Sequence, residues 1–452
     1  MSGITPTEEE LKNKASSLRE LNPTLGINKL LLQLKLDEPN WIVSEKRFKK
    51  YITPSINTTS TNLNDDNNEI DELIAKTGID NSIEISKIAP KVKVKMFNLN
   101  GKGKGLIAKE KLQKGELLWH EEPWIGTSDP SLWPFLEDND MCTSCLTLFQ
   151  QKNQPLSIKC KFCKQINFCN RLCYKKSIEE NSTHNDFLCI EQNSNSKSIL
   201  NFIKQKKSRD LQGVIRIISK WRKEREFGDL NKSIEIQNRI WNSMARINQK
   251  LKEEERKEWP FIAKDRMEEW RLTHLLILNA LNPSPKDEGY KSFQKFLNSK
   301  KRNESKPITK EEEERWFSFE SFLELLGLIG LNQESSGGLY ILHSHLNHSC
   351  DPNLQVRNLP KNWIAPNELP AELPPPMTTQ NRGTNRISII VKKEIIHKGE
   401  ELTISYVDQR LSRNERRIKL REQYGFWCFC QRCIKEKKEE DKEKEKEKLN
   451  DN

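Results

Sequence analysis

Hydrophobic and polar positions divide the chain into blocks of different periodicity. In the middle of the chain, apolar residues recur at spacings of three and four, the period of a helix that buries one face. The clearest of these segments are 211–224, 236–251 and 319–331. Short runs rich in β-branched and aromatic residues predict strands at 92–97, 105–110, 116–124, 386–393 and 401–407. The pattern predicts an α+β protein in which short strands flank a long helical region.

Three further segments have a different character. Helical patterning at 27–36 and 44–52 predicts a small N-terminal helical part, which the polar, aperiodic run 53–69 separates from the rest as a flexible linker. The proline-rich stretch 359–383 is expected to be a surface loop. The tail after Cys433 nearly balances its charges, so it should end as a frayed or solvated helix.

Composition narrows the class of protein. A chain of 452 residues with 35% hydrophobic residues can hold two or three domains. No apolar run approaches the roughly 20 residues of a membrane span, and the start lacks the order of a secretory signal, so we expect a cytosolic or nuclear protein with no membrane partner. A formal charge of +11 fits acidic partners such as nucleic acid or chromatin, and it fits plain solubility equally well.

The cysteines give the strongest chemical signal. In a reducing compartment, clustered cysteines at two- and three-residue spacings indicate zinc ligands rather than disulfides. A first cluster supplies eight ligands, enough for two tetrahedral ions: Cys142, Cys145, Cys160, Cys163, Cys169, Cys173, His184 and Cys189. A second supplies three, Cys428, Cys430 and Cys433, and Cys350 is the one cysteine left to complete it. The count predicts three zinc ions, the third of which pins the C-terminal segment over the run Asn347 to Ser349.

Four motifs in order resemble a known family. The glycine turn "GKGKGLIA" at 101–108, "NHSCDPN" at 347–353, "GEELTISY" at 399–406 and the trailing Cys-x-Cys-x2-Cys resemble the SET domain of protein-lysine methyltransferases with its post-SET zinc loop. The first cysteine cluster resembles a MYND finger. Residues 92–433 together resemble the SET-and-MYND family, and the N-terminal helices resemble its fungal branch.

The resemblance implies a fold and a division of the chain. The fold is α+β, a SET-domain β-fold of short strands with an inserted MYND zinc finger, a helical insert, a zinc-bound post-SET loop and an N-terminal helical extension. The implied parts are an N-terminal helical segment 1–51, a flexible linker 52–90, the first part of the SET domain 91–140, the MYND finger 141–190, the helical insert 191–330, the catalytic part of the SET domain 331–408, the post-SET segment 409–434 and a charged tail 435–452.

It also implies how the first cluster pairs. In the MYND finger the ligand pairs interleave, which puts Cys142, Cys145, Cys169 and Cys173 on one zinc and Cys160, Cys163, His184 and Cys189 on the other. The chain departs from the family in one place. Four residues separate His184 from Cys189, where the family has three.

The same resemblance assigns a cofactor, S-adenosylmethionine, and its site. The glycine turn offers main-chain groups, with added lysine charge, to the methionine carboxylate, whereas the asparagine binds the amino group. The implied cofactor-binding residues are Lys102, Gly103, Lys104, Gly105, Asn332, Asn347, His348, Tyr406 and Phe426. Tyr406 would face the methyl group and, with Tyr424, forms the implied catalytic pair. Tyr340 is a weaker candidate, and Glu400 and Glu401 are expected to serve the turn and the strand.

The implied activity is methylation of histone lysines, those of the histone H4 tail first, at chromatin in the nucleus and also in the cytoplasm. One alternative is a catalytically silent chromatin adaptor whose MYND finger binds proline-rich peptides. Another is a nucleic-acid-binding module built on the N-terminal helices and the basic stretches 204–210 and 220–226, which also fit solvated helix faces.

Overall fold

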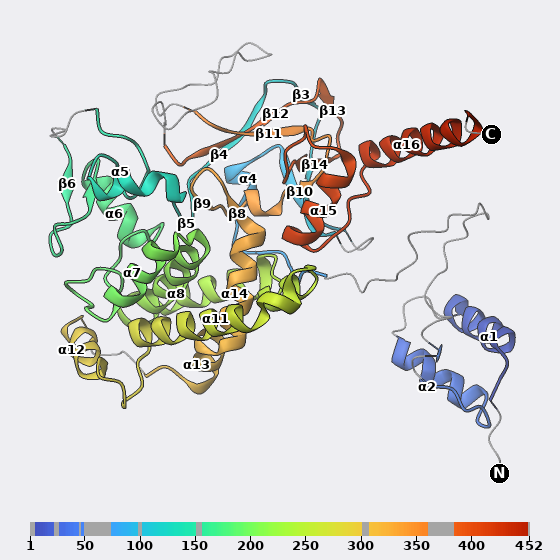
Figure 1. The fold of residues 1–452 in the computed structure, drawn as a ribbon, viewed down its shortest axis with the longest axis horizontal. Helices are drawn as coiled ribbons and strands as arrows, with labels where there is room; N and C mark the ends of the chain where they lie inside the picture. The colour runs from blue at the N-terminus through green and yellow to red at the C-terminus, as the bar shows by residue number, and fades with distance from the viewer. Residues whose placement is uncertain are drawn as a thin grey trace. The chain divides into compact units, whose positions relative to one another are not determined.

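The computed structural model describes residues 5–21, 27–44, 47–48, 74–97, 102–150, 156–300, 307–359 and 384–450. The chain divides into two compact units, Met1–Ile70 and Asp71–Asn452. The first contains helices α1 (Glu8–Leu21) and α2 (Ile27–Asp37) (Figure 1). It has a hydrophobic core of its own, with Leu11, Leu30 and Phe48 fully buried. The helix expected at 27–36 is confirmed; most of the one expected at 44–52 lies outside the described residues.

The second unit contains small sheets of short strands. The strands are β1 (Val92–Phe97), β2 (Gly103–Ala108), β3 (Leu112–Gln113), β4 (Leu117–Glu121), β5 (Ile125–Gly126), β6 (Ile158–Lys159), β7 (Asn167–Phe168), β8 (Gln333–Glu334), β9 (Gly338–Leu339), β10 (Asn347–His348), β11 (Leu354–Asn358), β12 (Ile387–Val391), β13 (Ile395–Ile396) and β14 (Glu401–Ile404). The largest sheet has the order β1-β2-β14-β10, and a second has the order β11-β12-β4. Leu106, Ile389 and Leu402 are fully buried in the core between these strands. All five predicted strands are present.

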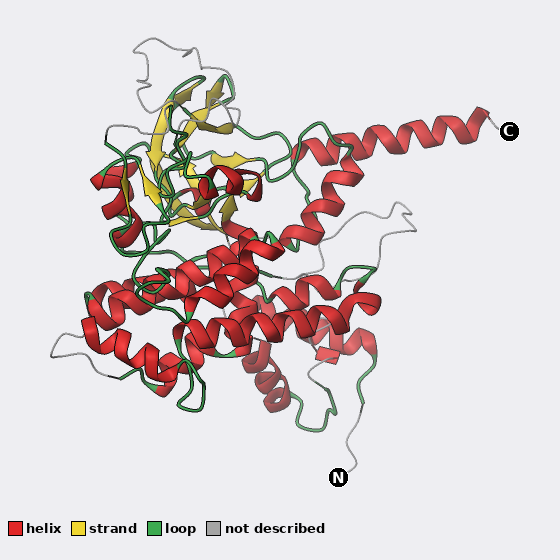
Figure 2. Ribbon diagram, turned by 60° about the vertical axis from the view of Figure 1, so that its left-hand side comes forward, coloured by secondary structure: helices red, strands yellow, loops and turns green. Residues whose placement is uncertain are grey.

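The second unit also contains helices, most of which gather below the strands in the view of Figure 2. They are α4 (Ile85–Ile88), α5 (Trp133–Glu137), α6 (Arg171–Glu179), α7 (Ser196–Lys206), α8 (Arg209–Phe227), α9 (Leu230–Asn238), α10 (Gln249–Glu254), α11 (Trp259–Leu281), α12 (Tyr290–Lys300), α13 (Lys310–Phe317), α14 (Phe319–Asn332), α15 (Arg413–Tyr424) and α16 (Gln431–Asn450). Three short turns are also helical, η1 (Pro130–Leu132), η2 (Arg239–Ser243) and η3 (His343–His345). Trp221 of α8 and Trp316 of α13 stack in the helical core, with ring centroids 4.6 Å apart.

Two predicted helices match the structure, and one does not continue as expected. Segments 211–224 and 319–331 lie within α8 and α14. The segment 236–251 instead passes from α9 through the π-helical turn η2 into an extended stretch before α10 begins at Gln249. The turn brings Ser243 against residues 77 and 78, since Gly78 N–H and the Thr77 hydroxyl both donate to the Ser243 carbonyl.

The second half of the expected linker is not a free connection. Residues 74–90 pack on the helical region: Lys76 N–H donates to the Arg246 carbonyl at 2.9 Å, and Asp80 pairs with Arg239 at 2.7 Å, both side chains being buried. The first half, 52–73, lies outside the described residues, as does the proline-rich stretch after Leu359. The expectation of a linker up to residue 90 is therefore wrong for residues 74–90.

The basic stretch 220–226 is not a solvated helix face. Lys220, Arg222 and Arg225 of α8 are buried, and Arg225 forms hydrogen bonds with both carboxylate oxygens of Glu312 at 2.6 and 3.0 Å. Arg222 pairs with Glu226 at 3.1 Å. These cations hold helices together, so this stretch does not supply a basic surface for nucleic acid.

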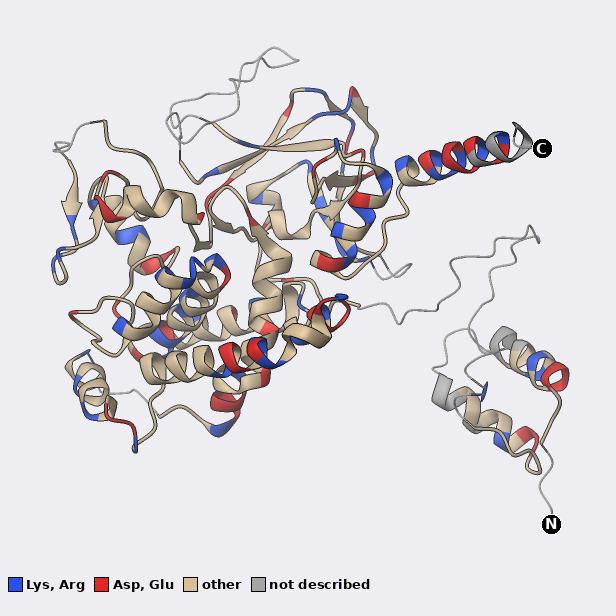
Figure 3. Ribbon diagram, viewed as in Figure 1, with Lys and Arg blue, Asp and Glu red and all other residues tan. Residues whose placement is uncertain are grey.

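The charged tail forms helix α16, along which basic and acidic residues alternate (Figure 3). Its first turns are tied to α15 by ion pairs, among them Arg413 with Glu440 at 3.0 Å. The prediction of a helical tail is confirmed over the described residues. In that described part of the chain, every helix is too short or too polar to cross a bilayer.

Candidate functional site

The twelve predicted metal ligands lie in three groups of four. They are Cys142, Cys145, Cys169 and Cys173; Cys160, Cys163, His184 and Cys189; and Cys350, Cys428, Cys430 and Cys433. Within each group all ligand atoms lie within 4.8 Å of one another. The first two sets are those that the family resemblance implied, with the interleaved pairs and the extra residue before Cys189, and the third is the one that the count of cysteines predicted.

The spacing within the groups suits a tetrahedral ion. A zinc ion with bonds of about 2.3 Å to sulfur would hold its sulfurs about 3.8 Å apart. The Sγ atoms of Cys160 and Cys189 are 3.9 Å apart, those of Cys350 and Cys428 are 3.8 Å apart, and Cys163 Sγ lies 3.6 Å from His184 Nε2. All eleven cysteines are free of disulfide bonds. The ligand types and their spacings therefore fit a zinc ion in each group.

Local turns direct the thiols of the first two groups. After each Cys-x2-Cys pair the next residue is left-handed, Leu146 with φ 58° and Lys164 with φ 54°, and its N–H donates back to the carbonyl of the first cysteine. This tight turn points both sulfurs of a pair to the same side. The side chain of Asn170 caps α6 by accepting from Cys173 N–H at 3.0 Å. Helix α6 thereby presents Cys173 to the first group.

The third group joins two distant segments beside the SET motifs. Strand β10 pairs in parallel with β14, with Asn347 opposite Thr403 and His348 opposite Ile404. Cys350 lies two residues after the end of β10, and its Sγ is 3.5 Å from that of Cys433 at the start of α16. The C-terminal cysteines thus lie next to the strand pair, as the count of ligands predicted.

Asn347 connects three motifs. Its Nδ2 donates to the Lys104 carbonyl of the glycine turn at 3.0 Å and to Glu401 Oε1 at 2.9 Å. Both amide hydrogens are therefore used, and Oδ1 remains as the atom that can accept a hydrogen bond from an ammonium group. Gly105 makes this approach possible, because a Cβ there would lie 2.6 Å from Asn347 Nδ2 and 2.6 Å from the Phe97 ring.

Glu401 has a larger part than the sequence indicated. Besides accepting from Asn347, its Oε2 pairs with Lys102 Nζ at 2.7 Å. Its side chain is mostly covered, and it fixes the asparagine amide in one orientation. The run "GEEL" contains two adjacent carboxylates, and spacing alone could not show that Glu401, rather than Glu400, faces β10.

Other predicted cofactor residues are engaged elsewhere. Lys104 Nζ is buried and donates to the Ser243 carbonyl at 2.8 Å, so the lysine presents only its main chain to the turn. Gly103 has φ +67°, and a Cβ there would lie 2.4 Å from Thr77 Cγ2. Asn332, at the end of α14, donates to the carbonyls of Ala245 and Leu328 at 2.7 Å each. Among the described contacts, none links Asn332 with Asn347.

The predicted aromatic residues come together. The rings of Tyr406 and Tyr424 have centroids 4.6 Å apart, and His348 lies 5.3 Å from Tyr406 and 6.1 Å from Phe426. Tyr406 N–H donates to His348 Nδ1 at 3.0 Å, and its hydroxyl donates to the Leu346 carbonyl at 2.5 Å. Tyr340 is not part of this group. It is fully buried, and its hydroxyl donates to the Asn385 carbonyl.

Burial sets the charge states of this aromatic group. It raises the pKa of Tyr406 well above its usual value, helped by the neighbouring Tyr424 and Glu401, and raises the pKa of Tyr424 to about 12. Burial also lowers the pKa of His348 to about 4. Both phenols and the imidazole are therefore neutral at pH 7. They can orient a substrate through hydrogen bonds, but neither tyrosine is available as a tyrosinate base.

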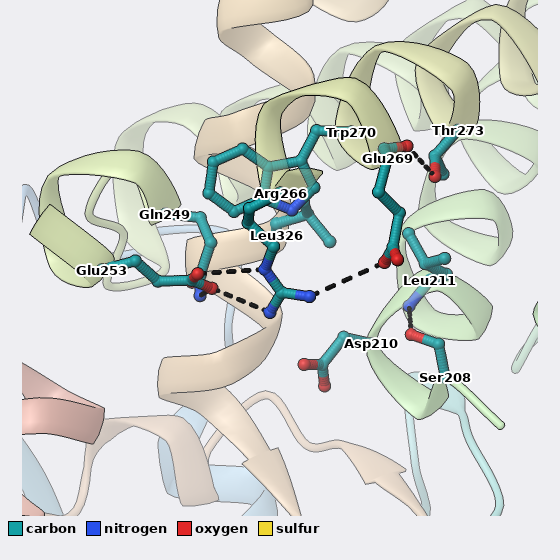
Figure 4. Close-up of a pocket in the computed structure, with 10 residues that line it drawn as sticks. All are labelled: Ser208, Asp210, Leu211, Gln249, Glu253, Arg266, Glu269, Trp270, Thr273 and Leu326. Atoms are coloured by element: carbon teal, nitrogen blue, oxygen red, sulfur yellow. Dashed lines mark hydrogen bonds and ion pairs between the residues drawn. The ribbon is translucent and has the colours of Figure 1, made fainter. Parts of the chain in front are cut away.

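A small cavity in the helical region is separate from these residues. It lies between α8, α10, α11 and α14, with a volume of about 60 Å³ (Figure 4). Arg266 occupies its wall and donates to both oxygens of Glu253 at 3.0 Å. None of the predicted cofactor residues lines it, and its volume suits one or two waters rather than a cofactor.

Comparison with known proteins gives the family. The model of the SET domain matches residues 103–407. A histone-lysine N-methyltransferase SET5 of Mycosarcoma maydis is 28% identical over 74% of this chain and 65% of its own length, and one of Meyerozyma guilliermondii is 26% identical over 96% and 81%. A SET and MYND domain-containing protein of Dictyostelium discoideum is 25% identical over 73% and 80%. The chain thus spans less than two thirds of the M. maydis protein. With the SET domain model covering most of its length and its motifs meeting at Asn347, the chain belongs to the SET domain family.

Proposed function

We propose that the protein is an S-adenosylmethionine-dependent protein-lysine N-methyltransferase. The observation that carries this is the junction at Asn347, where the glycine turn, the strand before Cys350 and the strand leading to Tyr406 meet. The names of the fungal relatives support histones as the substrate class, and within it we expect lysines of the histone H4 tail. In this proposal the enzyme acts at chromatin in the nucleus, and a further pool of the protein is in the cytoplasm.

The three ligand groups are assigned to zinc. Residues 141–190 would form a MYND finger with two ions, and residues 409–434 a post-SET segment whose third ion also takes Cys350. The sulfur spacings support this assignment. Structural zinc contributes on the order of 10 kcal/mol of apparent binding energy to a small domain, so the finger would depend on its metal to fold.

In this proposal the cofactor, when bound, supplies a methyl group activated on a sulfonium. Asn347 accepts a hydrogen bond from the methionine ammonium through Oδ1, held in place by Glu401 and the Lys104 carbonyl. Main-chain groups from Lys102 to Gly105 face the methionine carboxylate, and His348 and Phe426 contact the adenosine. Asn332 remains a weaker candidate, because its amide is already used within the helical region.

The substrate lysine must lose its proton before it can attack. A lysine with a pKa near 10.4 costs about 4 to 5 kcal/mol to deprotonate at pH 7. The adjacent rings of Tyr406 and Tyr424 form an apolar wall that favours the neutral amine by excluding water. Since both phenols are neutral, the proton leaves to solvent rather than to a tyrosinate. The Tyr406 hydroxyl, anchored on the Leu346 carbonyl, orients the amine and the methyl group through its oxygen lone pairs.

The test is methyl transfer to core histones together with calorimetric titration of S-adenosylmethionine. Tyr406→Phe should lower kcat by about a hundred- to a thousandfold with little change in cofactor affinity, because the hydroxyl acts mainly in the transition state. Asn347→Ala should weaken cofactor binding first. Tyr290→Phe, a tyrosine of α12 in the helical region, serves as the matched control. Normal turnover by Tyr406→Phe would remove its assigned role. A wild type that binds proline-rich peptides but methylates no protein would favour the silent adaptor.

A further inference from the structure

One arginine is fully buried against the third cysteine group. Arg416, on α15, has no exposed surface, and its Nη2 lies 3.9 Å from Cys433 Sγ. The same Nη2 pairs with Glu436 of α16, and Nη1 donates to the Leu411 carbonyl at 2.5 Å. Nε is buried and has no hydrogen-bond partner among the described residues. Such a side chain is costly to bury unless a negative charge faces it.

The cysteine group supplies that negative charge once it holds its metal. Four thiolates around a divalent cation carry a net charge of −2, and a buried charge without a partner costs several kcal/mol. Arg416 is the cationic side chain that touches a sulfur of this group among the described contacts. In the other two groups, no arginine contacts a sulfur in the part of the chain that the structure describes.

Glu436 does not by itself account for the arginine. This carboxylate is a quarter exposed, and Arg432 Nε already pairs with it at 2.7 Å. It would therefore keep a cationic partner without Arg416. Without Arg416, the thiolate group would lose its cationic partner among the described residues. Arg432 cannot replace it, because its Nη1 donates to the carbonyls of Cys350 and Gln409 rather than to a sulfur.

We propose that Arg416 is the counter-charge of the tetrathiolate zinc site and a positioning residue for the aromatic wall. It contacts the metal group from the first turn of α15, and this helix ends at Tyr424, whose ring centroid lies 4.6 Å from that of Tyr406. Loss of the counter-charge should loosen the metal, and with it the link between α15, Cys350 and α16. The proposal rests on the zinc assignment made above, and it does not require that the protein methylate any substrate.

The experiment measures zinc release from the full chain to a coloured chelator. Arg416→Met should speed the release of one zinc in three by tenfold to a hundredfold, the range expected for a hydrogen bond to a charged group. Arg416→Lys, which keeps the charge, should recover part of the loss. The other two ions serve as internal controls, and their release should be unchanged if the fold is intact.

Glu436→Gln distinguishes a counter-charge from an ordinary ion pair. If Arg416 serves the thiolates, removing the carboxylate leaves its charge facing sulfur, so the third zinc should be released no faster than in the wild type. If Arg416 only pairs with Glu436, this variant should speed release as much as Arg416→Met does, and the proposal fails. It also fails if Arg416→Met releases zinc at the wild-type rate. Should Arg416→Met not fold, the release rates of the other proteins still decide the question. The proposal expects the third zinc to leave Arg416→Lys faster than it leaves Glu436→Gln or the wild type, and the opposite order would overturn it. A preparation that lacks methyl transfer but shows this ordering separates the two proposals.

Discussion

Lys104 offers a prediction about stability that comes directly from its surroundings. Its main chain belongs to the glycine turn, but the residue is only 3% exposed and its amine donates to the Ser243 carbonyl. Burial lowers the pKa of Lys104 from 10.5 to about 7, with the carboxylate of Asp80 acting in the opposite direction. The amine is therefore about half neutral in the folded protein at pH 7, whereas in the unfolded chain it is almost fully charged.

The sign of the effect follows from proton counting. Between pH 7 and pH 10.5 the unfolded chain binds more protons at this group than the folded chain does, so the free energy of unfolding rises with pH. Each pH unit within that window contributes at most about 1.4 kcal/mol. Integrated from pH 7 to pH 9 with the two pKa values, the gain is about 2 kcal/mol. Below pH 7 both states become protonated and the penalty of burying the ammonium is present in full.

Lys104→Met removes the titrating group and keeps most of the side-chain volume. Urea unfolding of the wild type and of this variant at pH 7 and pH 9 measures the difference. The wild type should gain about 2 kcal/mol more than the variant over this interval. Lys93→Met, an exposed lysine on β1, is the control and should keep the wild-type gain. Equal gains in the wild type and in Lys104→Met would show that the amine is solvated or fully paired, and the reasoning would be refuted.

Two other predictions concern the metal and the glycine turn. Elemental analysis of the purified chain should find about three zinc ions, and Cys350→Ser should lose about one and weaken cofactor binding; a finding of two in the wild type would exclude the link between Cys350 and the C-terminal cysteines. Gly105→Ala should weaken S-adenosylmethionine binding in calorimetry at least tenfold, because its Cβ would displace the Asn347 amide, whereas Gly330→Ala, which meets only the flexible end of Lys252, should bind as the wild type does. Unchanged affinity of Gly105→Ala would mean that the asparagine need not lie where it does.

Some features could be predicted from sequence because a local rule determines them. Tetrahedral zinc needs four ligands, so an unmatched trio of cysteines pointed to Cys350 although 78 residues separate it from Cys428. Strands such as 92–97 and 387–391 follow from runs of β-branched and apolar residues. In both cases the information is contained in residue type and spacing, and no knowledge of the tertiary fold is required.

The features that could not be predicted depend on contacts between distant segments. Nothing in the composition of residues 74–90 indicates that Asp80 pairs with Arg239, 159 residues away. The direction of the Lys104 amine is similar: a lysine in a glycine turn suggests a solvated charge, and only the position of η2 beneath the turn gives it a carbonyl to bond. Basic residues of α8 were also predicted to be solvated, because helical periodicity does not reveal that acidic residues of another helix cover them.

The arrangement separates two halves of the candidate site that depend on different parts of the chain. The polar half, Asn347 with Glu401 and Lys102, is held by the sheet and by side-chain hydrogen bonds among residues that lie before α15. The aromatic half takes Tyr424 from the end of α15 and Phe426 from the segment between α15 and the cysteines of the third group. That segment is fixed at one end by α15 and at the other by the ligands around Cys350, so ordering its rings costs little conformational entropy only while both anchors hold. The third metal group therefore matters more for the wall that would receive the lysine than for the polar contacts that would hold the methionine end of the cofactor.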